Sequence, residues 1–109
     1  MNNEPEASKA FILKDSIDYA PNSVVSKTII KTPAGTITLF SFEKGEQLSE
    51  HTSPYDALVQ LLDGSAEITI GGRSNSLRAG ESILLPANIP HALRAGERFK
   101  MMLTMIKSQ

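Results

Sequence analysis

His51 and His91 are the two histidines of the chain, and the chain contains no cysteine. The lack of cysteine excludes disulfides, thiolate metal sites and cysteine nucleophiles. A neutral imidazole offers one hydrogen-bond donor and one acceptor, and it titrates near physiological pH. The two imidazoles and nearby oxygen-bearing side chains are therefore the candidates for chemistry, and they suit the binding of a small polar molecule.

Serine-hydrolase chemistry has no support in the sequence. No serine lies in a Gly-x-Ser-x-Gly segment, and no histidine lies at a nucleophile-elbow spacing from Ser53. We assign no catalytic residue from the sequence.

Short runs of β-branched and apolar residues, separated by turn residues about every ten positions, predict that strands position these side chains. Alternation over residues 66–70 predicts that Ala66, Ile68 and Ile70 face inward, and Gln60 is predicted to face outward. The apolar run 57–62 predicts a strand that is covered on both faces. The predicted strands lie near residues 25–30, 36–42, 57–62, 66–70, 73–77, 82–86, 91–94 and 99–106, with a loop from 47 through 54.

Glycine pairs predict the tight turns. Asp63-Gly64 and Gly71-Gly72 are expected to form hairpin turns, because glycine adopts positive φ angles without a steric penalty. Asn88 is expected to replace a turn glycine, since asparagine tolerates a left-handed backbone. No helix-length apolar period competes with these signals, so the sequence predicts an all-β fold.

The 109-residue length and ordinary hydrophobic content of 40% predict one domain over residues 10–109, preceded by a flexible polar leader over residues 1–9. With 11 basic and 12 acidic residues, the net charge of -1 disfavours nucleic-acid binding. No apolar run is long enough to span a bilayer, and the first residues do not resemble a signal peptide. We therefore expect a cytoplasmic protein that has no contact with a membrane.

The segment Gly45-x5-His51-x-Ser53-x3-Ala57-x6-Gly64 resembles the first motif of the cupin family. In that motif a glycine precedes a His-x-His pair, followed by a glutamate and a closing glycine. Spacing matches at Gly45, His51 and Gly64.

A second segment, Gly80-x5-Pro86-x-Asn88-x2-His91, resembles the second cupin motif, Gly-x5-Pro-x-Gly-x2-His. The two segments together contain 32 of the 109 residues, and their combined spacing is more specific than any single glycine motif. The resemblance implies a double-stranded β-helix, or jelly-roll, barrel with His51 and His91 at its mouth.

The metal-ligand set implied by the resemblance is incomplete. Cupins hold a divalent metal with three histidines and a glutamate, and here Ser53 replaces the second histidine and Ala57 the glutamate. Two imidazoles without thiolates cannot close a structural zinc site, whereas two histidines and one carboxylate are the set of non-haem iron oxygenases. Asp56 is a candidate third ligand if its segment begins in a loop, although strand alternation predicts that Glu50 and Asp56 face away from His51.

Three functions follow. The first is the binding of a small polar molecule in the barrel by His51, Ser53 and His91, with a weak or absent metal site. The second is a metal-dependent small-molecule enzyme of the dioxygenase or isomerase type, so whether the chain is an enzyme is left open. The third is a dimeric interaction or sensing module. We expect a homodimer, because cupins commonly pair through their sheets and the chain has apolar strands near both ends.

Overall fold

The computed structural model describes residues 5–107, and strands make up most of this range. The predicted all-β class is confirmed. No helix among the described residues is long and apolar enough to cross a membrane. The elements are the 3-10 turn η1 (Leu13–Asp15) and the strands β1 (Val24–Thr32), β2 (Gly35–Phe42), β3 (Gln47–His51), β4 (Asp56–Ile70), β5 (Arg73–Arg78), β6 (Ser82–Leu85), β7 (His91–Arg94) and β8 (Phe99–Ile106).

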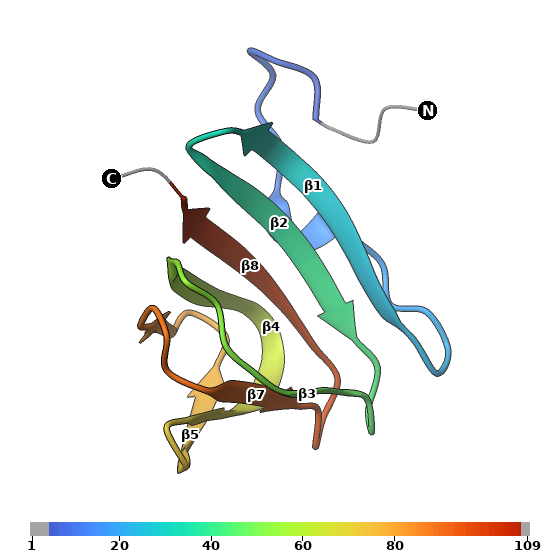
Figure 1. Cartoon of the computed structure of the whole chain (residues 1–109). Coiled ribbons are helices and arrows are strands. Elements are labelled where there is room, and N and C mark those ends of the chain that lie inside the picture. The colour runs from blue at the N-terminus through green and yellow to red at the C-terminus, as the bar shows by residue number, and fades with distance from the viewer. Residues whose placement is uncertain (1–4, 108–109) are drawn as a thin grey trace.

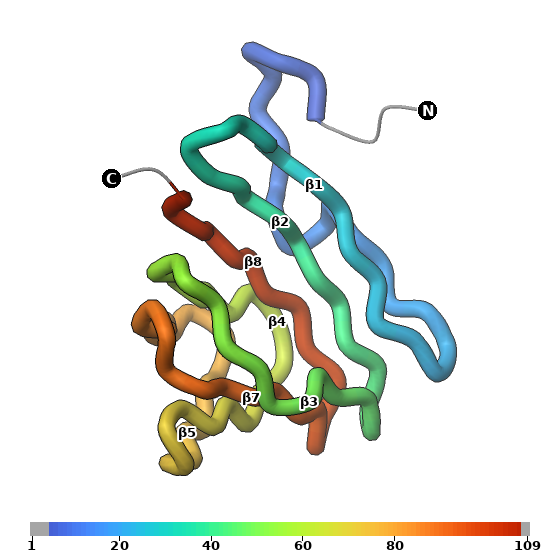
Figure 2. The backbone as a smooth tube through the Cα atoms, viewed as in Figure 1, coloured from blue at the N-terminus to red at the C-terminus, as the bar shows by residue number. Residues whose placement is uncertain are grey.

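The strands form two antiparallel sheets that share β4 (Figure 1). We call the first, with strand order β1-β2-β8-β4-β6, the large sheet, and the second, with order β5-β4-β7-β3, the small sheet. The first half of β4 belongs to the large sheet and its second half to the small sheet. The shared strand curls from one sheet into the other, as the backbone tube in Figure 2 shows, and β1 and β2 lie on the side away from the small sheet.

The continuity of β4 corrects the predicted hairpin turn at Asp63-Gly64. The pairing of β4 with β8 shifts register between Leu61 and Asp63, and Gly64 has a φ of 74° within the strand. A Cβ at Gly64 would collide with the carbonyl oxygen of Arg98. Glycine therefore permits a bulge and a close backbone approach here, so that the chain passes from one sheet to the other without turning back.

Two other turn predictions are confirmed. Gly71 and Gly72 both have positive φ and connect β4 to β5, with Ile70 paired to Arg73. Asn88 has a φ of 65°. Both results reflect the steric rule that few residues other than glycine and asparagine adopt this conformation at low cost.

The predicted loop over residues 47–54 is wrong in its first half, because β3 occupies Gln47–His51. This strand is mostly exposed and has one half-buried residue, Leu48. Its intrinsic sequence signal is therefore weak, and pairing with β7 is what holds it extended.

The core lies between the sheets, on the face that we call the inner face of each. Phe42 and Phe99 are paired across β2 and β8, and their rings stack with centroids 4.5 Å apart. Ala66 and Ile68 are buried as predicted, and Ile70 is half-buried. The prediction that residues 57–62 are covered on both faces is only partly right: Ala57, Val59 and Leu61 are buried, whereas the alternate positions, including Gln60, are half-buried on the outer face.

The segment from η1 to residue 20 lies on the outer face of the large sheet, where Lys and Ser side chains hold its backbone. The Ser41 hydroxyl donates to the carbonyl oxygen of Asp18 at 2.8 Å. Lys27 donates to the carbonyl oxygen of Ser16 at 3.0 Å, and Lys100 donates to that of Lys14 at 2.7 Å. This segment therefore acts as a strap across one part of the sheet.

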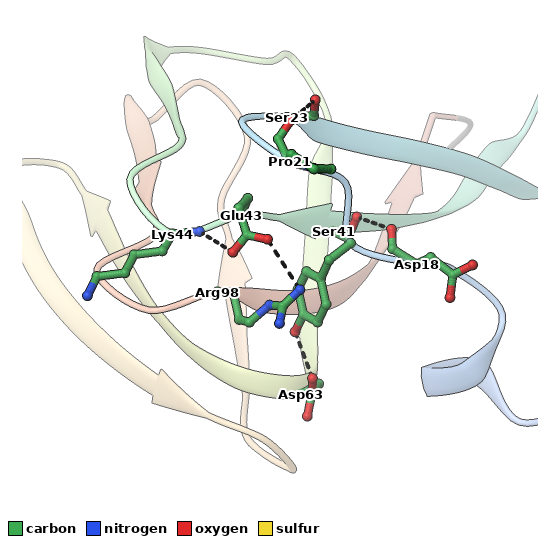
Figure 3. A network of polar contacts seen from close by, with 9 residues as sticks. Asp18, Pro21, Ser23, Ser41, Glu43, Lys44, Asp63 and Arg98 are labelled. Carbon is green, nitrogen blue, oxygen red and sulfur yellow. Dashed lines mark hydrogen bonds and ion pairs between the residues drawn. The ribbon is translucent and has the colours of Figure 1, made fainter.

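Tyr19 fixes the end of this strap. Its hydroxyl donates to Asp63 at 2.7 Å, the Arg98 guanidinium lies 3.8 Å from its ring centroid, and Arg98 pairs with Glu43 at 3.2 Å (Figure 3). Burial, together with the hydrogen bond to Asp63, raises the pKa of Tyr19. The predicted leader begins outside the described residues, which start at position 5, and its flexibility stays a prediction.

Candidate functional site

A β-bulge brings His51 next to His91. Strand β3 pairs Leu48 with Leu93 and His51 with His91. Between these two pairs, β3 contains one residue more than β7. Without the extra residue His51 would project to the face opposite that of Leu48, because strand side chains alternate. The bulge restores His51 to the inner side, where His91 begins β7.

The two imidazoles lie against each other. Their ring centroids are 4.3 Å apart, and the ring planes make an angle of 71°. His91 is only 7% exposed, whereas His51 is exposed. One ring of the pair is therefore buried in the small sheet and the other is open to solvent. A molecule from outside can reach such a pair.

Backbone carbonyls determine which nitrogen of each ring carries the hydrogen. His51 Nδ1 lies 2.7 Å from the carbonyl oxygen of Ser49, and His91 Nδ1 lies 3.3 Å from that of Ile89. A carbonyl oxygen can only accept, so Nδ1 is the donor in both rings. In the neutral state each Nε2 then has a free lone pair.

The surroundings of His91 favour this neutral state. Burial lowers the pKa of His91, and the neighbouring His51 lowers it further, while the hydrogen bond to Ile89 acts in the opposite direction. Removing a cationic ring from water is costly, and a second imidazolium nearby would add repulsion. His91 is therefore an acceptor over a wider pH range than an ordinary histidine.

Ser53 lies in a loop that is bonded to the second motif. Its hydroxyl accepts a hydrogen bond from the backbone N–H of Tyr55 at 3.2 Å, and its carbonyl oxygen accepts one from Asn88 at 2.7 Å. These bonds give Ser53 a structural role in joining the loops before β4 and β7. Its use in ligand binding stays a prediction.

Asp56, the candidate third metal ligand, instead forms a hydrogen bond with the backbone. Its Oδ1 accepts a hydrogen bond from the backbone N–H of Ala87 at 2.8 Å. Within residues 5–107 no three His, Cys, Asp or Glu side chains are grouped so that they could hold a metal ion. Two imidazoles do not fit the three or four protein ligands of a tight metal centre. The donor set therefore does not match the metal that the cupin motifs imply.

Two threonines, Thr36 and Thr38, were not among the sequence candidates. Register pairs Thr38 with Leu103, which packs against the core, so both threonines project from the inner face of the large sheet. Thr36 lies in register with Met105, and Met105 with Ala57, the position where the cupin motif has its glutamate. The alternation of Thr with Ile37 and Leu39 is visible in the sequence, but the usual rule would have put the apolar residues inside.

A separate polar groove of about 400 Å³ lies on the outer face of the small sheet. Its lining includes Gln47, Ser49, Glu50, Glu67 and Arg94, and neither histidine belongs to it. Glu50 thus projects away from the histidine pair, in agreement with its predicted phase. The carboxylate of Glu67 accepts hydrogen bonds from the neighbouring Ser74 and Ser76 hydroxyls, which lower its pKa.

Comparison with known proteins agrees with this architecture. A conserved protein of unknown function from Streptococcus pyogenes is 37% identical, with a TM-score of 0.92 over 99% of this chain and 95% of that one. A Cupin 2 conserved barrel domain protein from Leptotrichia buccalis is 43% identical, with a TM-score of 0.86 over 89% of this chain and 47% of that one.

Among curated proteins, polyketide synthase CurC from Streptomyces cyaneus is 26% identical over 73 residues, which are 66% of this chain. The match spans 47% of the length of that relative. The model of the Cupin domain family matches residues 38–107, which include both histidine motifs. The chain therefore belongs to the cupin family.

Proposed function

We propose that this protein binds a small neutral molecule that carries hydroxyl groups, at the side of the barrel where His51 and His91 meet. The observation that carries this proposal is the orientation of the two rings. Both Nδ1 atoms are occupied by backbone carbonyls, and the ring centroids lie 4.3 Å apart. Two acceptor nitrogens on adjacent rings favour a ligand that supplies two hydrogen-bond donors close together, such as a vicinal diol or a catechol.

The surroundings suit such a ligand. Thr36 and Thr38 project from the inner face of the large sheet beside apolar neighbours such as Leu103 and Met105, and we expect their hydroxyl groups to take part in binding. Binding sites for small molecules are commonly apolar with a few polar groups that set orientation. The curated relative is named a polyketide synthase, and the hydroxyl groups of polyketides are donors of the required kind. Phenolic diols are therefore the first probes to use.

The metal-dependent enzyme reading requires a ligand set that the described residues do not provide. Asp56 is bonded to Ala87, and the motif positions of the second histidine and the glutamate hold Ser53 and Ala57. A non-catalytic binding site needs none of these ligands. We therefore favour binding over metal-assisted catalysis.

The test is calorimetric titration with catechol and with its dimethyl ether, which has the same shape but no donor. The wild type should bind catechol and not the ether, and both His51→Ala and His91→Ala should weaken binding by about tenfold or more, because each removes an acceptor for one of the two ligand hydroxyls. Gln47→Ala, in the separate groove, should leave binding unchanged.

Equal binding of catechol and its ether would contradict the proposal. Metal analysis of the purified protein gives a second check. Near-stoichiometric metal that is lost in both histidine variants would support the enzyme reading instead.

A further inference from the structure

The bulge in β3 that turns His51 inward also shapes the outer face of the small sheet. On β3, Ser49 and Glu50 lie between the two residues that pair with β7, whereas on β7 only Ala92 lies between the corresponding partners. Ser49 and Glu50 both line the polar groove of about 400 Å³ on this face. Ala92 has only a methyl group with which to fill the space opposite these two residues. The groove is therefore a consequence of the bulge.

A row of polar side chains borders the groove. Register places Gln47 of β3 opposite Arg94 of β7, and Arg94 opposite Glu67 of β4. Their chain neighbours Leu93 and Ile68 are buried in the core, so the row projects to the outer face. Residues opposite each other in antiparallel strands have Cβ atoms about 5 Å apart. An amide, a guanidinium and a carboxylate thus lie side by side.

The carboxylate of Glu67 is held by hydroxyl groups on its β5 side. Ser76, which lies opposite Glu67, and the nearby Ser74 each donate a hydrogen bond to one of its oxygens. These two bonds lower the pKa of Glu67, burial acts in the opposite direction, and the charge of Arg94 lowers the pKa further. Glu67 is therefore ionised at neutral pH and retains lone pairs for a ligand.

The charged groups of the groove are not consumed by one another. Both ion pairs that occur within residues 5–107 lie elsewhere in the chain. Arg94 is exposed and influences Glu67 through its charge without forming an ion pair with it in this range. Glu50 is exposed as well. One guanidinium and two carboxylates are therefore available to a ligand.

We propose that this groove binds an α-amino acid with a small polar side chain, in its zwitterionic form. Arg94, beside the Gln47 amide, receives the carboxylate, because a guanidinium binds a carboxylate through two parallel hydrogen bonds. The carboxylates of Glu67 and Glu50 receive the ammonium group, which has three donors. The remaining polar lining, including Thr69, suits a ligand side chain that carries a hydroxyl group.

The charges of the groove disfavour other classes of ligand. A polyanion would meet the two carboxylates, and a polycation would meet the guanidinium. A metal ion would lack ligands, since the described part of the chain has no group of three His, Cys, Asp or Glu side chains that could hold one. The groove does not include the histidine pair, so the proposal is independent of the proposed function.

The experiment is a titration of the ¹⁵N-labelled full chain with L-serine, followed through the backbone amide signals in NMR spectra. We expect saturable shifts at Thr69, Ala92 and Arg94, with a dissociation constant in the millimolar range, because few groups of an open groove contact the ligand. Serine methyl ester lacks the carboxylate, and N-acetylserine lacks the ammonium group. Each should bind about tenfold more weakly than serine or worse.

Two variants test the two ends of the ligand. Arg94→Gln and Glu67→Gln should each weaken serine binding by about tenfold or more, because each removes a charge-assisted hydrogen bond. Arg78→Gln and Glu97→Gln are the matched controls, since both residues are exposed and neither lines the groove. Thermal melting verifies that each variant folds. If a variant does not fold, the two serine derivatives still test both contacts on the wild type.

Absence of saturable shifts with serine would overturn the proposal, as would equal affinity for serine and either derivative. Shifts centred on the inner face of the large sheet, for example at Leu103, would also overturn it. Catechol binding is measured separately, so failure of one proposal does not affect the other.

Discussion

The two faces of the large sheet differ most clearly along one strand, β2. Its inner face has Phe42 in the core and then Thr36 and Thr38, whereas its outer face has Ile37 and Leu39. The polar side chains are thus inside and the apolar ones outside at this end of the strand. Leu39 is buried because the strap covers it. The reversed pattern agrees with the proposed polar ligand on the inner face, and on the outer face the strap covers part of the apolar side chains.

Truncating a side chain at the core end of the inner face should lower the free energy of unfolding far more than truncating one on the surface. Phe42→Ala removes a fully buried ring that stacks on Phe99, and we expect a loss of about 3 to 5 kcal/mol in the free energy of unfolding. Phe11→Ala, at an exposed phenylalanine, should cost less than about 0.5 kcal/mol. Urea denaturation measures both. Similar losses in the two variants would mean that the core has been placed on the wrong face.

The strap should account for a smaller part of the stability. Tyr19→Phe removes the hydrogen bond to Asp63, and we expect a loss of about 1 to 2 kcal/mol, because the carboxylate loses a partner in a partly buried place. Tyr55→Phe is the matched control, since the structure gives its hydroxyl no hydrogen bond in the described range. Thermal melting of both variants checks this, and equal melting temperatures would show that the strap is not held by Tyr19.

Changing polarity at neighbouring positions of β2 should separate the inner face from the outer face. Thr38→Val should weaken catechol binding by about threefold to tenfold, because it removes a hydroxyl from the inner face. Ile37→Thr changes a side chain on the outer face and should leave catechol binding unchanged. Calorimetric titration of both variants measures the two effects. Equal weakening in the two variants would contradict the assignment of the two faces.

The smallest effect concerns pH. The pKa of His91 is lower in the folded protein than the value of about 6.5 for an unperturbed histidine. Between these two values the unfolded chain binds more protons, so stability is complete above about pH 6.5 and declines as the pH falls from there to the folded pKa.

Urea denaturation from pH 7.5 to 5 should show that His91→Gln loses less stability than the wild type as the pH falls. His51 is the titratable group that faces His91, so the same measurement on His51→Ala should show an intermediate loss. Identical pH dependence in all three proteins would contradict the lowered pKa.

The sequence predicted those parts of the fold that depend on local sterics. Gly71-Gly72 and Asn88 adopt the expected positive φ angles because few other residues tolerate them. The alternation over residues 66–70 identified Ala66 and Ile68 as buried, since one face of that strand alone meets the core.

The errors arose where distant segments decide the outcome. Gly64 looks like a turn residue, but the approach of the Arg98 carbonyl makes it a bulge within a long strand. Strand β3 has little propensity of its own and depends on β7. The bulge that turns His51 toward His91 also depends on pairing with β7, so it could not be predicted from the local sequence. The motif spacing indicated that the rings would meet, but only the fold gives their orientation.

The central claim is that both histidines present Nε2 as an acceptor. Two-dimensional ¹⁵N–¹H correlation spectra of the imidazole rings in labelled protein near pH 7.5 distinguish the two neutral tautomers directly. We predict that His51 and His91 both carry their hydrogen on Nδ1 and have an unprotonated Nε2. A hydrogen on Nε2 of either ring would contradict the proposed binding of a two-donor ligand.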